Sequence, residues 1–343
     1  AATRVDENGL VNYAEIIGDE EVTNGDFATD SDWTKGAGWT ISGGTASHTG
    51  GASYLSQDVL QVDTLYKVNI SVTAVSGGGF VQIYMGNSPA SVLISVIGDY
   101  TYYFTSQSSV TLGLALRSLG DVTIDNVSVK EAARDNVPRI DYTGGGCPHI
   151  LAEPQRTNLI TYSEDYDDAS WTKSQTTITP NATTSPDGAV NASKLTEAAL
   201  SGSHTITQGN ITVTSGAEVS YSVFAKKGER DFMLLWFGQV STGYSFDLNN
   251  GAIGSKIGGG TLTPKIEDYG NGWYKCTVTG TAPSTLANII IYTMTAATTY
   301  SYAGDGTSGI YIWGSQLEEG SYATSYIPNF GTALGVTRNQ DIF

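Results

Sequence analysis

The tetrapeptide Asp32-Trp33-Thr34-Lys35 and its near copy Ser170-Trp171-Thr172-Lys173 lie about 138 residues apart in the chain. Each follows a short acidic and aromatic stretch, residues 24–27 (NGDF) in the first case and residues 163–166 (SEDY) in the second. Each copy closes on a strand-like segment, residues 122–129 (VTIDNVSV) and residues 309–317 (GIYIWGSQL). A match that recurs at a long fixed distance indicates internal duplication. The sequence therefore predicts two divergent copies of one β module.

The composition favours strands and turns over helices. The 343 residues include 41 Gly and 20 Tyr, a profile typical of strands joined by Gly-rich turns. The formal net charge of −17 would repel nucleic acid and anionic membrane surfaces. No apolar run approaches the length of a membrane-spanning helix. We therefore expect no nucleic-acid partner and no membrane insertion, with the acidity serving solubility or supplying carboxylates for divalent cations.

Alternating apolar residues place the strands. In the first module one face of these strands carries Tyr66, Val68, Ile70, Val72, Val81, Ile83, Met85, Leu112, Leu114 and Leu116. In the second module strong strand patterns cover residues 219–226, 231–237, 243–248, 272–279, 288–295 and 310–313. Many short strands separated by Gly-rich turns predict an all-β chain of two tandem β-sandwich (jelly-roll) domains.

Connecting segments with different patterns divide the chain further. The predicted parts are an N-terminal arm at 1–21, a first jelly roll at 22–131, a β-hairpin connector at 132–157, a second jelly roll at 158–328 and a C-terminal tail at 329–343. Prolines 138, 148 and 154 exclude central strands from the connector, so it should form edge strands or an extended arm. The tail should be extended or docked on a neighbouring subunit.

Several motifs of the second half carry a family resemblance. They are residues 153–166 (EPQRTNLITYSEDY), 185–188 (SPDG), 194–197 (KLTE), 224–230 (FAKKGER), 271–274 (NGWY) and 310–320 (IYIWGSQLEEG). In this order they resemble a segment of tailed-phage virion proteins and of some marine bacterial surface proteins, which is regarded as a concanavalin-like or carbohydrate-binding jelly roll. Residues 2–10 and 136–142 resemble the same family, in which the two pieces lie close in sequence. The first module therefore looks inserted between them.

The first module resembles carbohydrate-binding modules of the family-four and family-nine type. The residues that carry this resemblance are 24–27 (NGDF), Trp33, Trp39 and 124–129 (IDNVSV). Those families often hold a structural calcium ion, and Asp26 and Asp125 are the matching positions here. The glutamate that usually follows the Phe is Ala28 in this chain, which departs from the family pattern. The resemblance implies calcium as the one candidate cofactor.

Candidate sugar-binding residues follow from the alternation of the strands. If Val81, Ile83 and Met85 face the core, Gln82, Tyr84 and Arg117 face outward, where a ring and polar side chains could hold a pyranose. Ordinary cross-strand surface pairing explains the same pattern. In the second module the corresponding candidates are Lys226, Lys275 and Tyr292, beside Phe224. The run from Met233 to Phe237 is apolar on both faces, which is typical of a strand covered on both sides.

The tryptophans and the polar residues argue against an active site. Trp33 and Trp171 occupy equivalent positions and are predicted to fill the two cores, with Trp236, Trp273 and Trp313 also buried. None of the three histidines has a metal-ligand spacing, and no nucleophile elbow or P-loop occurs. A glycosidase would need two carboxylates across a cleft, which a sequence cannot exclude. We therefore predict a protein that is not an enzyme.

Three hypotheses about function remain. The first is a virion surface or other extracellular adhesion protein that binds cell-surface or extracellular glycan through its jelly-roll grooves, assembled with other virion or filament subunits and as a homo-oligomer. The second is the carbohydrate-binding portion of a secreted polysaccharide-degrading enzyme. The third is a structural capsid or filament protein whose jelly rolls tile without binding sugar.

Overall fold

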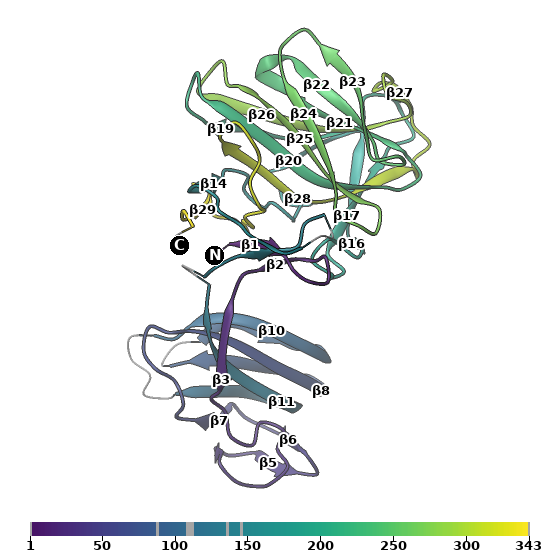
Figure 1. The fold of residues 1–343 in the computed structure, drawn as a ribbon. Coiled ribbons are helices and arrows are strands. Elements are labelled where there is room, and N and C mark those ends of the chain that lie inside the picture. The colour runs from purple at the N-terminus through teal and green to yellow at the C-terminus, as the bar shows by residue number, and fades with distance from the viewer. Residues whose placement is uncertain (1, 87–88, 108–112, 135–136, 145–146, 342–343) are drawn as a thin grey trace. The chain divides into compact units, whose positions relative to one another are not determined.

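The computed structural model describes residues 2–86, 89–107, 113–134, 137–144 and 147–341. The chain divides into a smaller compact unit, Glu15–Arg134, and a larger one that combines Ala1–Ala14 with Asp135–Phe343 (Figure 1). Both units are built from antiparallel strands, with one short 3-10 turn at Gly238–Val240 as the helical element of the described chain. The smaller unit is thus an insertion into the sequence of the larger one, and the predicted all-β fold is confirmed.

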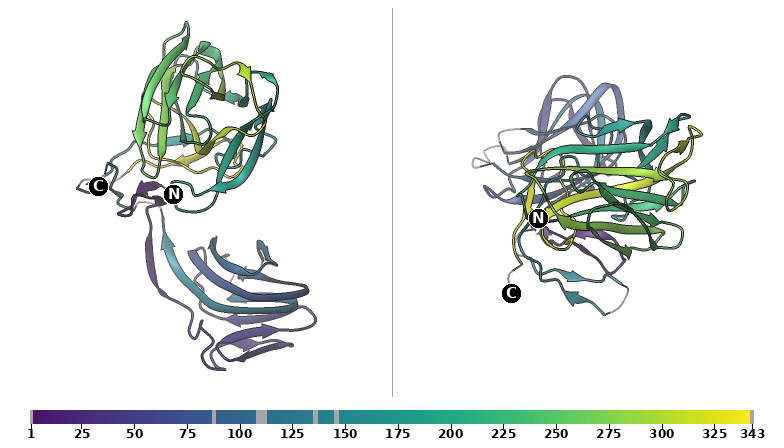
Figure 2. Two further views of the ribbon diagram at one scale, coloured as in Figure 1. Left: turned by 90° about the vertical axis from the view of Figure 1, so that its right-hand side faces the viewer. Right: turned by 90° about the horizontal axis from the view of Figure 1, so that it is seen from above.

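The smaller unit is organised around two long strands. Its strands are β3 (Ile16–Glu20), β4 (Thr34–Lys35), β5 (Trp39–Ser42), β6 (Thr45–His48), β7 (Ser53–Gln57), β8 (Leu65–Met85), β9 (Pro89–Ile94), β10 (Gly98–Thr105) and β11 (Leu114–Ala133). β8 and β11 pair along their length and curve together across the unit (Figure 2). On its other edge β8 pairs first with β10 and then with β9, while β11 pairs with β7, β6 and β3. One long antiparallel pair of strands, which are not consecutive in the chain, therefore contributes to both halves of the sandwich.

The core of the smaller unit is the apolar face expected from the sequence. Its buried side chains include Tyr66, Val68, Ile70, Val72, Val81, Ile83, Met85, Leu114 and Leu116. The predicted core position Leu112 lies outside the described residues. Residues 16–20, expected in the arm, instead form β3 and pair with the end of β11. The alternation of apolar residues correctly predicted which face of each strand is removed from water.

The larger unit is a sandwich of two six-stranded sheets. Its strands are β1 (Thr3–Val5), β2 (Val11–Tyr13), β12 (Ile140–Asp141), β13 (His149–Ile150), β14 (Arg156–Asn158), β15 (Thr172–Ser174), β16 (Thr176–Thr183), β17 (Ala192–Glu197), β18 (Ser201–Gly202), β19 (Thr205–Thr212), β20 (Glu218–Lys227), β21 (Phe232–Phe237), β22 (Thr242–Asp247), β23 (Ala252–Gly258), β24 (Thr263–Asp268), β25 (Trp273–Thr281), β26 (Leu286–Met294), β27 (Tyr302–Ala303), β28 (Gly309–Glu319) and β29 (Val336–Arg338). One sheet has the order β15-β19-β26-β21-β22-β23, and we call it the aromatic sheet. The other, β16-β17-β28-β20-β25-β24, is called the arm sheet.

The arm, the connector and the tail all pack within the larger unit. β1 and β2 form a hairpin around the turn at Gly9. β12 pairs with β13 within the predicted hairpin connector. Tail strand β29 pairs with β14 of the same chain. The buried Arg139 binds Glu153 at 3.0 Å and also Asp341 of the tail. The arm, the connector and the tail are thus each paired within their own unit.

A second apolar cluster lies between the arm and the outer face of the arm sheet. It contains Val5, Val11, Ala192, Phe224, Trp273, Trp313 and Tyr326, each less than a tenth exposed. Trp33 and Trp171 are 7% and 1% exposed inside the main cores, as predicted. Trp236 differs, because it is half-buried on the outer face of the aromatic sheet rather than in the core.

The two copies of the sequence repeat form the same local structure. Trp33 Nε1 donates a 2.9 Å hydrogen bond to the carbonyl oxygen of Asn24, and Trp171 Nε1 donates one of 3.0 Å to that of Tyr162. Asn24 and Tyr162 both have left-handed backbones, with φ of 55° and 54°. We call each of these Trp-centred turns a Trp clasp.

A glutamine completes each Trp clasp. Gln57 binds both backbone polar groups of Thr23, and Gln208 binds both of Thr161, at 2.6–3.2 Å. Gln57 and Gln208 are 8% and 4% exposed. The four-residue sequence match is therefore the visible part of a longer structural duplication.

The strand registers extend the duplication to the sheets. β8 and β11 pair Val68 with Val129 and Ser71 with Asp125, across a register shift. β20 and β28 pair Tyr221 with Leu317 and Phe224 with Trp313, across a shift at the same place. The second half of β8 and the first half of β11 likewise correspond to β21 and β26. Side chains can therefore be compared position by position between the units.

Candidate functional site

The three sugar-binding candidates of the smaller unit lie together on one outward face. Arg117 of β11 is the cross-strand partner of Gln82 on β8 and of Tyr54 on β7. Tyr84 is two residues beyond Gln82 and lies in the next row, opposite Ala115. Gln82, Tyr84 and Arg117 are half-buried, and Tyr54 is 37% exposed. The structure thus brings the predicted residues into one surface, which we call the Tyr84 face.

Aromatic rings give this face its chemistry. The rings of Tyr54 and Tyr84 meet edge to face at 5.5 Å and 87°. The guanidinium of Arg117 lies 5.8 Å from the centre of the Phe80 ring. Burial, and then the neighbouring hydroxyl of Tyr54, raise the pKa of Tyr84, so its hydroxyl stays protonated and can donate at neutral pH. A ring surface bordered by amide, guanidinium and hydroxyl groups can pack on a pyranose and bind its hydroxyls.

A second group of aromatic rings lies at the outer face of the aromatic sheet in the larger unit. Tyr292 of β26 lies between Leu234 of β21 and Thr205 of β19. The Tyr292 ring contacts Trp236 at 6.5 Å and Tyr300 at 6.0 Å, both edge to face. Tyr300 is 39% exposed, whereas Trp236 and Tyr292 are half-buried. We call this surface the Trp236 face.

The Tyr84 and Trp236 faces occupy the same position in the duplicated fold. Leu116 pairs with Ile83 in the smaller unit, as Ile291 pairs with Leu235 in the larger one. The residues that follow these paired positions in the sequence point to the outer face. They are Arg117 and Tyr84 in the smaller unit, and Tyr292 and Trp236 in the larger one. Two copies that have diverged in sequence both present aromatic side chains at this position.

Two predicted residues lie elsewhere and do not join this face. Lys226 and Lys275 are on β20 and β25 of the arm sheet. Lys275 is 3% exposed, and its ammonium donates to the carbonyl oxygen of Thr324 at 2.5 Å. Burial lowers the pKa of Lys275. The assignment of Lys275 to sugar binding was wrong, because the segment that carries Thr324 covers the Lys275 side chain and binds its ammonium.

Sequence reasoning missed Tyr54, Trp236 and Tyr300. Tyr54 lies between the buried Ser53 and Leu55, but the sequence shows no apolar alternation there, because the polar Ser53 and Gln57 face inward with Leu55. Trp236 was hidden in an apolar run, because Leu234 on the same outward face is fully buried. Tyr300 lies in the loop after β26, and only the tertiary structure brings it to Tyr292.

The two candidate calcium ligands have simple local contacts. Asp26 is exposed and accepts a 3.3 Å hydrogen bond from the backbone N–H of Ala28. Asp125 is half-buried and accepts one of 2.7 Å from Asn126. No group of three or more His, Cys, Asp or Glu suited to a metal occurs among the described residues. Calcium prefers six to eight oxygen ligands, so two carboxylates do not make the site by themselves, and calcium binding stays a prediction.

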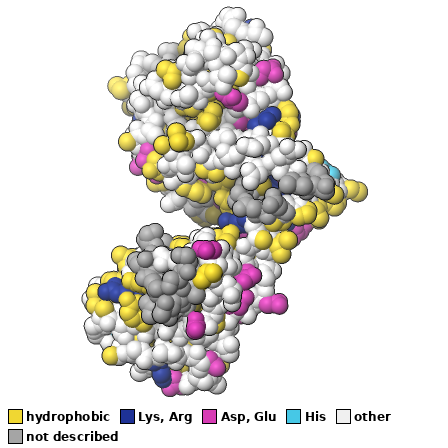
Figure 3. Space-filling view, turned by 90° about the vertical axis from the view of Figure 1, so that its left-hand side faces the viewer, with side chains coloured by type: hydrophobic (Ala, Val, Ile, Leu, Met, Phe, Trp, Pro, Cys, Tyr) yellow, Lys and Arg dark blue, Asp and Glu magenta, His cyan; other side chains and the backbone are white. Residues whose placement is uncertain are grey.

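Acidic residues are distributed over the surface rather than gathered at a site. The space-filling view shows Asp and Glu side chains scattered on one face, with few Lys and Arg (Figure 3). Two of the less exposed carboxylates are bound by arginines: Glu153 by Arg139 and Arg338 at 3.0 and 2.6 Å, and Glu197 by Arg230.

Within the described residues, no helix has the length and apolar character needed to cross a bilayer.

Comparisons with known proteins give weak structural likenesses. No protein-family model matches the sequence, and no curated protein is significantly similar to it. The chain is similar to the N-terminal CBM22-1-CBM22-2 tandem domain of Xyn10C from Paenibacillus barcinonensis, with 12% identity, a TM-score of 0.31 and coverage of 90% of this chain and 100% of that one. It is also similar to truncated AlyQ with CBM32 and alginate lyase domains, with 11% identity, a TM-score of 0.23 and coverage of 90% and 100%.

A third likeness is to the secreted serine protease VesC from Vibrio cholerae. Its identity is 11% and its TM-score 0.20, over 84% of this chain and 48% of that one. The chain therefore spans about half of that protease. At these scores the function has to be argued from the residues of the chain itself.

Proposed function

We propose that this protein is a non-enzymatic glycan-binding protein that uses the Tyr84 and Trp236 faces. The observation that carries the proposal is that both copies of the duplicated sandwich present aromatic rings on the same outward face. Cross-strand pairing can account for rings on one sheet, but it does not require both diverged copies to carry rings at the same outward position. Side chains able to form hydrogen bonds lie beside the rings, Gln82 and Arg117 in one unit and Thr205 in the other.

The two faces would act together. A pyranose stacked on one or two rings gains little energy by itself, since each aromatic contact contributes about 0.5–1.5 kcal/mol beyond its buried area. Two faces on one chain, multiplied over many chains on a particle, would raise the avidity without new contacts. This multivalent use suits the surface of a virion, the setting implied by the sequence resemblance of residues 153–328 to tailed-phage proteins.

The role of a carbohydrate-binding portion of a secreted polysaccharide-degrading enzyme would use the same two faces. It differs only in what the chain is attached to. Finding the coding sequence fused to a catalytic domain would favour that role over attachment to a host surface.

A glycan array followed by calorimetry tests the proposal. We expect binding to an array glycan and a loss of about tenfold in affinity for Tyr84→Ala and for Trp236→Ala, with near abolition in the double variant. Phe330→Ala is the matched control, because Phe330 is an aromatic side chain 66% exposed in the tail and belongs to neither face. Unchanged binding by the folded double variant, or no binding to any array glycan, would contradict the proposal.

A further inference from the structure

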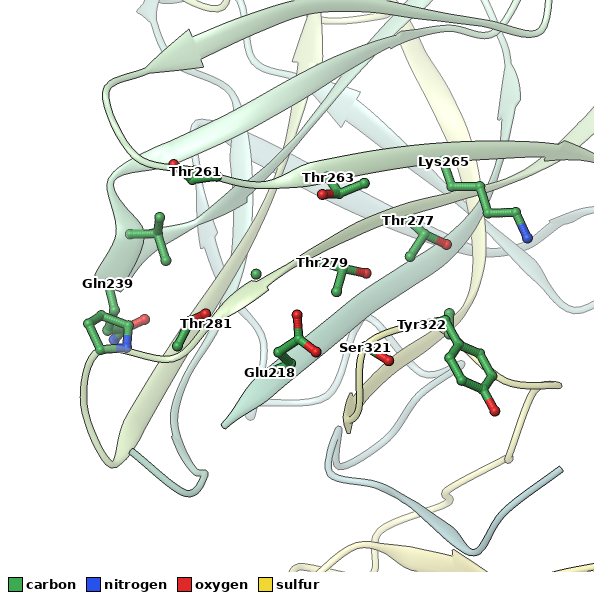
Figure 4. A pocket seen from close by; sticks show the side chains of 14 residues that line it. Glu218, Gln239, Thr261, Thr263, Lys265, Thr277, Thr279, Thr281, Ser321 and Tyr322 are labelled. Atoms are coloured by element: carbon green, nitrogen blue, oxygen red, sulfur yellow. The ribbon is translucent and has the colours of Figure 1, made fainter. Parts of the chain in front are cut away.

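The outer face of the arm sheet contains a groove that the two aromatic faces do not include. It has a volume of about 610 Å³, within the range of roughly 300–1,000 Å³ typical of small-molecule sites. Its floor is formed by β24 and β25, where Thr263 lies opposite Thr279 and Lys265 opposite Thr277 (Figure 4). Gln239 borders one end and Tyr322 the other. The groove therefore lies on the sheet opposite to the Trp236 face.

One hydroxyl in this groove lacks a partner. Thr277 is 2% exposed, and its Oγ1 has no hydrogen-bond partner among the residues that the structure describes. The neighbouring Thr279 differs, because its hydroxyl is 2.9 Å from Ser220 Oγ. A buried hydroxyl without a partner costs about 1–3 kcal/mol. A ligand hydroxyl placed in the groove could form the missing hydrogen bond.

The lining indicates the class of ligand. Threonine hydroxyls both donate and accept hydrogen bonds, as the hydroxyls of a sugar do. The charged side chains are of both signs: Glu218 on one strand, and Lys265, whose ammonium is 2.7 Å from Glu267. The ring of Tyr322, 48% exposed, offers a flat apolar surface at the end of the row. This lining matches an uncharged, polyhydroxylated molecule with one apolar face.

We propose that this groove is a separate binding site for a neutral saccharide, in which Thr277 Oγ1 binds a sugar hydroxyl. The site is independent of the Tyr84 and Trp236 faces, so either assignment can fail without the other. The smaller unit offers no equivalent among its described strands, because β24, which forms part of the groove floor, has no counterpart beside β10.

The test uses the full chain carrying Tyr84→Ala and Trp236→Ala, which removes the proposed faces. Its threonine methyl groups are ¹³C-labelled and followed by NMR during titration with maltotetraose, cellotetraose and laminaritetraose. Tetragalacturonate is the anionic comparison. We expect at least one neutral tetrasaccharide to shift the methyl signals of Thr263, Thr277 and Thr279, and tetragalacturonate to leave them unmoved.

The variant Thr277→Val keeps the side-chain shape and removes the hydroxyl. It should weaken binding of the active tetrasaccharide by about threefold to tenfold, while the melting temperature stays the same or rises. Thr293→Val is the matched control, because the buried Thr293 hydroxyl is paired with Tyr302 at 2.7 Å on the opposite sheet. That variant should melt at a lower temperature and bind normally.

Three results would overturn the proposal. They are the absence of methyl shifts with all three neutral tetrasaccharides at roughly 10 mM, a preference for tetragalacturonate, and undiminished affinity of Thr277→Val. Loss of array binding by the double aromatic variant together with any of these would leave the two faces supported and the groove refuted.

Discussion

Glu164 is a half-buried acid of the larger unit. Its carboxylate accepts a 3.0 Å hydrogen bond from the hydroxyl of Tyr326. Burial raises the pKa of Glu164 from 4.5 to about 7, and the nearby Asp187 adds to the rise. A folded state that holds a proton more tightly than the unfolded chain loses stability as the pH rises between the two pKa values.

The variant Glu164→Gln tests this effect. The contribution of Glu164 is fully present below about pH 4.5 and is lost as the pH rises to about 7. Because each unit of pKa shift corresponds to about 1.4 kcal/mol, the variant should gain roughly 3 kcal/mol of unfolding free energy relative to the native chain between pH 4 and pH 8. Urea denaturation at a series of pH values measures the difference.

The exposed Glu7 provides the control for that series. Its side chain is 63% exposed, so Glu7→Gln should show no comparable gain across the same pH range. A constant difference between Glu164→Gln and the native chain at all pH values would show that the carboxyl of Glu164 titrates normally in the folded state.

The Trp clasp is the element that the two units share most closely. In each unit a short strand after the tryptophan pairs with the strand that carries the clasp glutamine: Thr34 pairs with Ser56, and Thr172 with Thr207. The glutamine then fixes the turn before the tryptophan by binding its backbone. The Trp clasp thereby connects the turn before the tryptophan of each unit to the strands that carry its Tyr84 face or Trp236 face.

Removal of the clasp glutamine should destabilise the unit that contains it. Gln57→Ala and Gln208→Ala each remove two hydrogen bonds to a backbone that is partly shielded from water, at a cost of about 2 kcal/mol. Differential scanning calorimetry should show a lower melting temperature for the corresponding unit. Gln107→Ala, at an exposed position, should change the unfolding free energy by less than about 0.5 kcal/mol. Equal melting of Gln208→Ala and Gln107→Ala would contradict the structural role of the clasp.

The whole molecule consists of one sandwich inserted into another. At the junction of the smaller unit, Arg134 Nε donates a 3.0 Å hydrogen bond to Glu15, and Ile16 pairs with Ala133. In the larger unit Tyr142 N–H donates to Val5 at 3.1 Å, which joins the two segments on either side of the insertion. Each unit thus closes its own chain ends, and each hydrophobic cluster is made of residues from one unit.

Excision of the inserted unit should therefore leave two folded proteins. Replacing residues 15–134 by a short Gly-Ser linker should preserve β-type circular dichroism and cooperative unfolding in the larger unit, because its hydrophobic core and its arm contacts remain complete. Residues 15–134 expressed alone should also unfold cooperatively. An aggregated product, or one without a thermal transition, would show that the units stabilise one another.

The sequence alone determined the all-β class, the duplication and the faces of the core strands, because side chains alternate across a strand with a period of two and this pattern is local. It also identified Gln82, Tyr84 and Arg117 as outward-facing for the same reason. Only the tertiary structure decided which outward faces are accessible. Lys275 and Tyr292 both point away from the main core, yet a segment about 50 residues further along the chain covers Lys275, while Tyr292 joins an aromatic face. Coverage of a sheet depends on long-range packing, and strand periodicity contains no information about it.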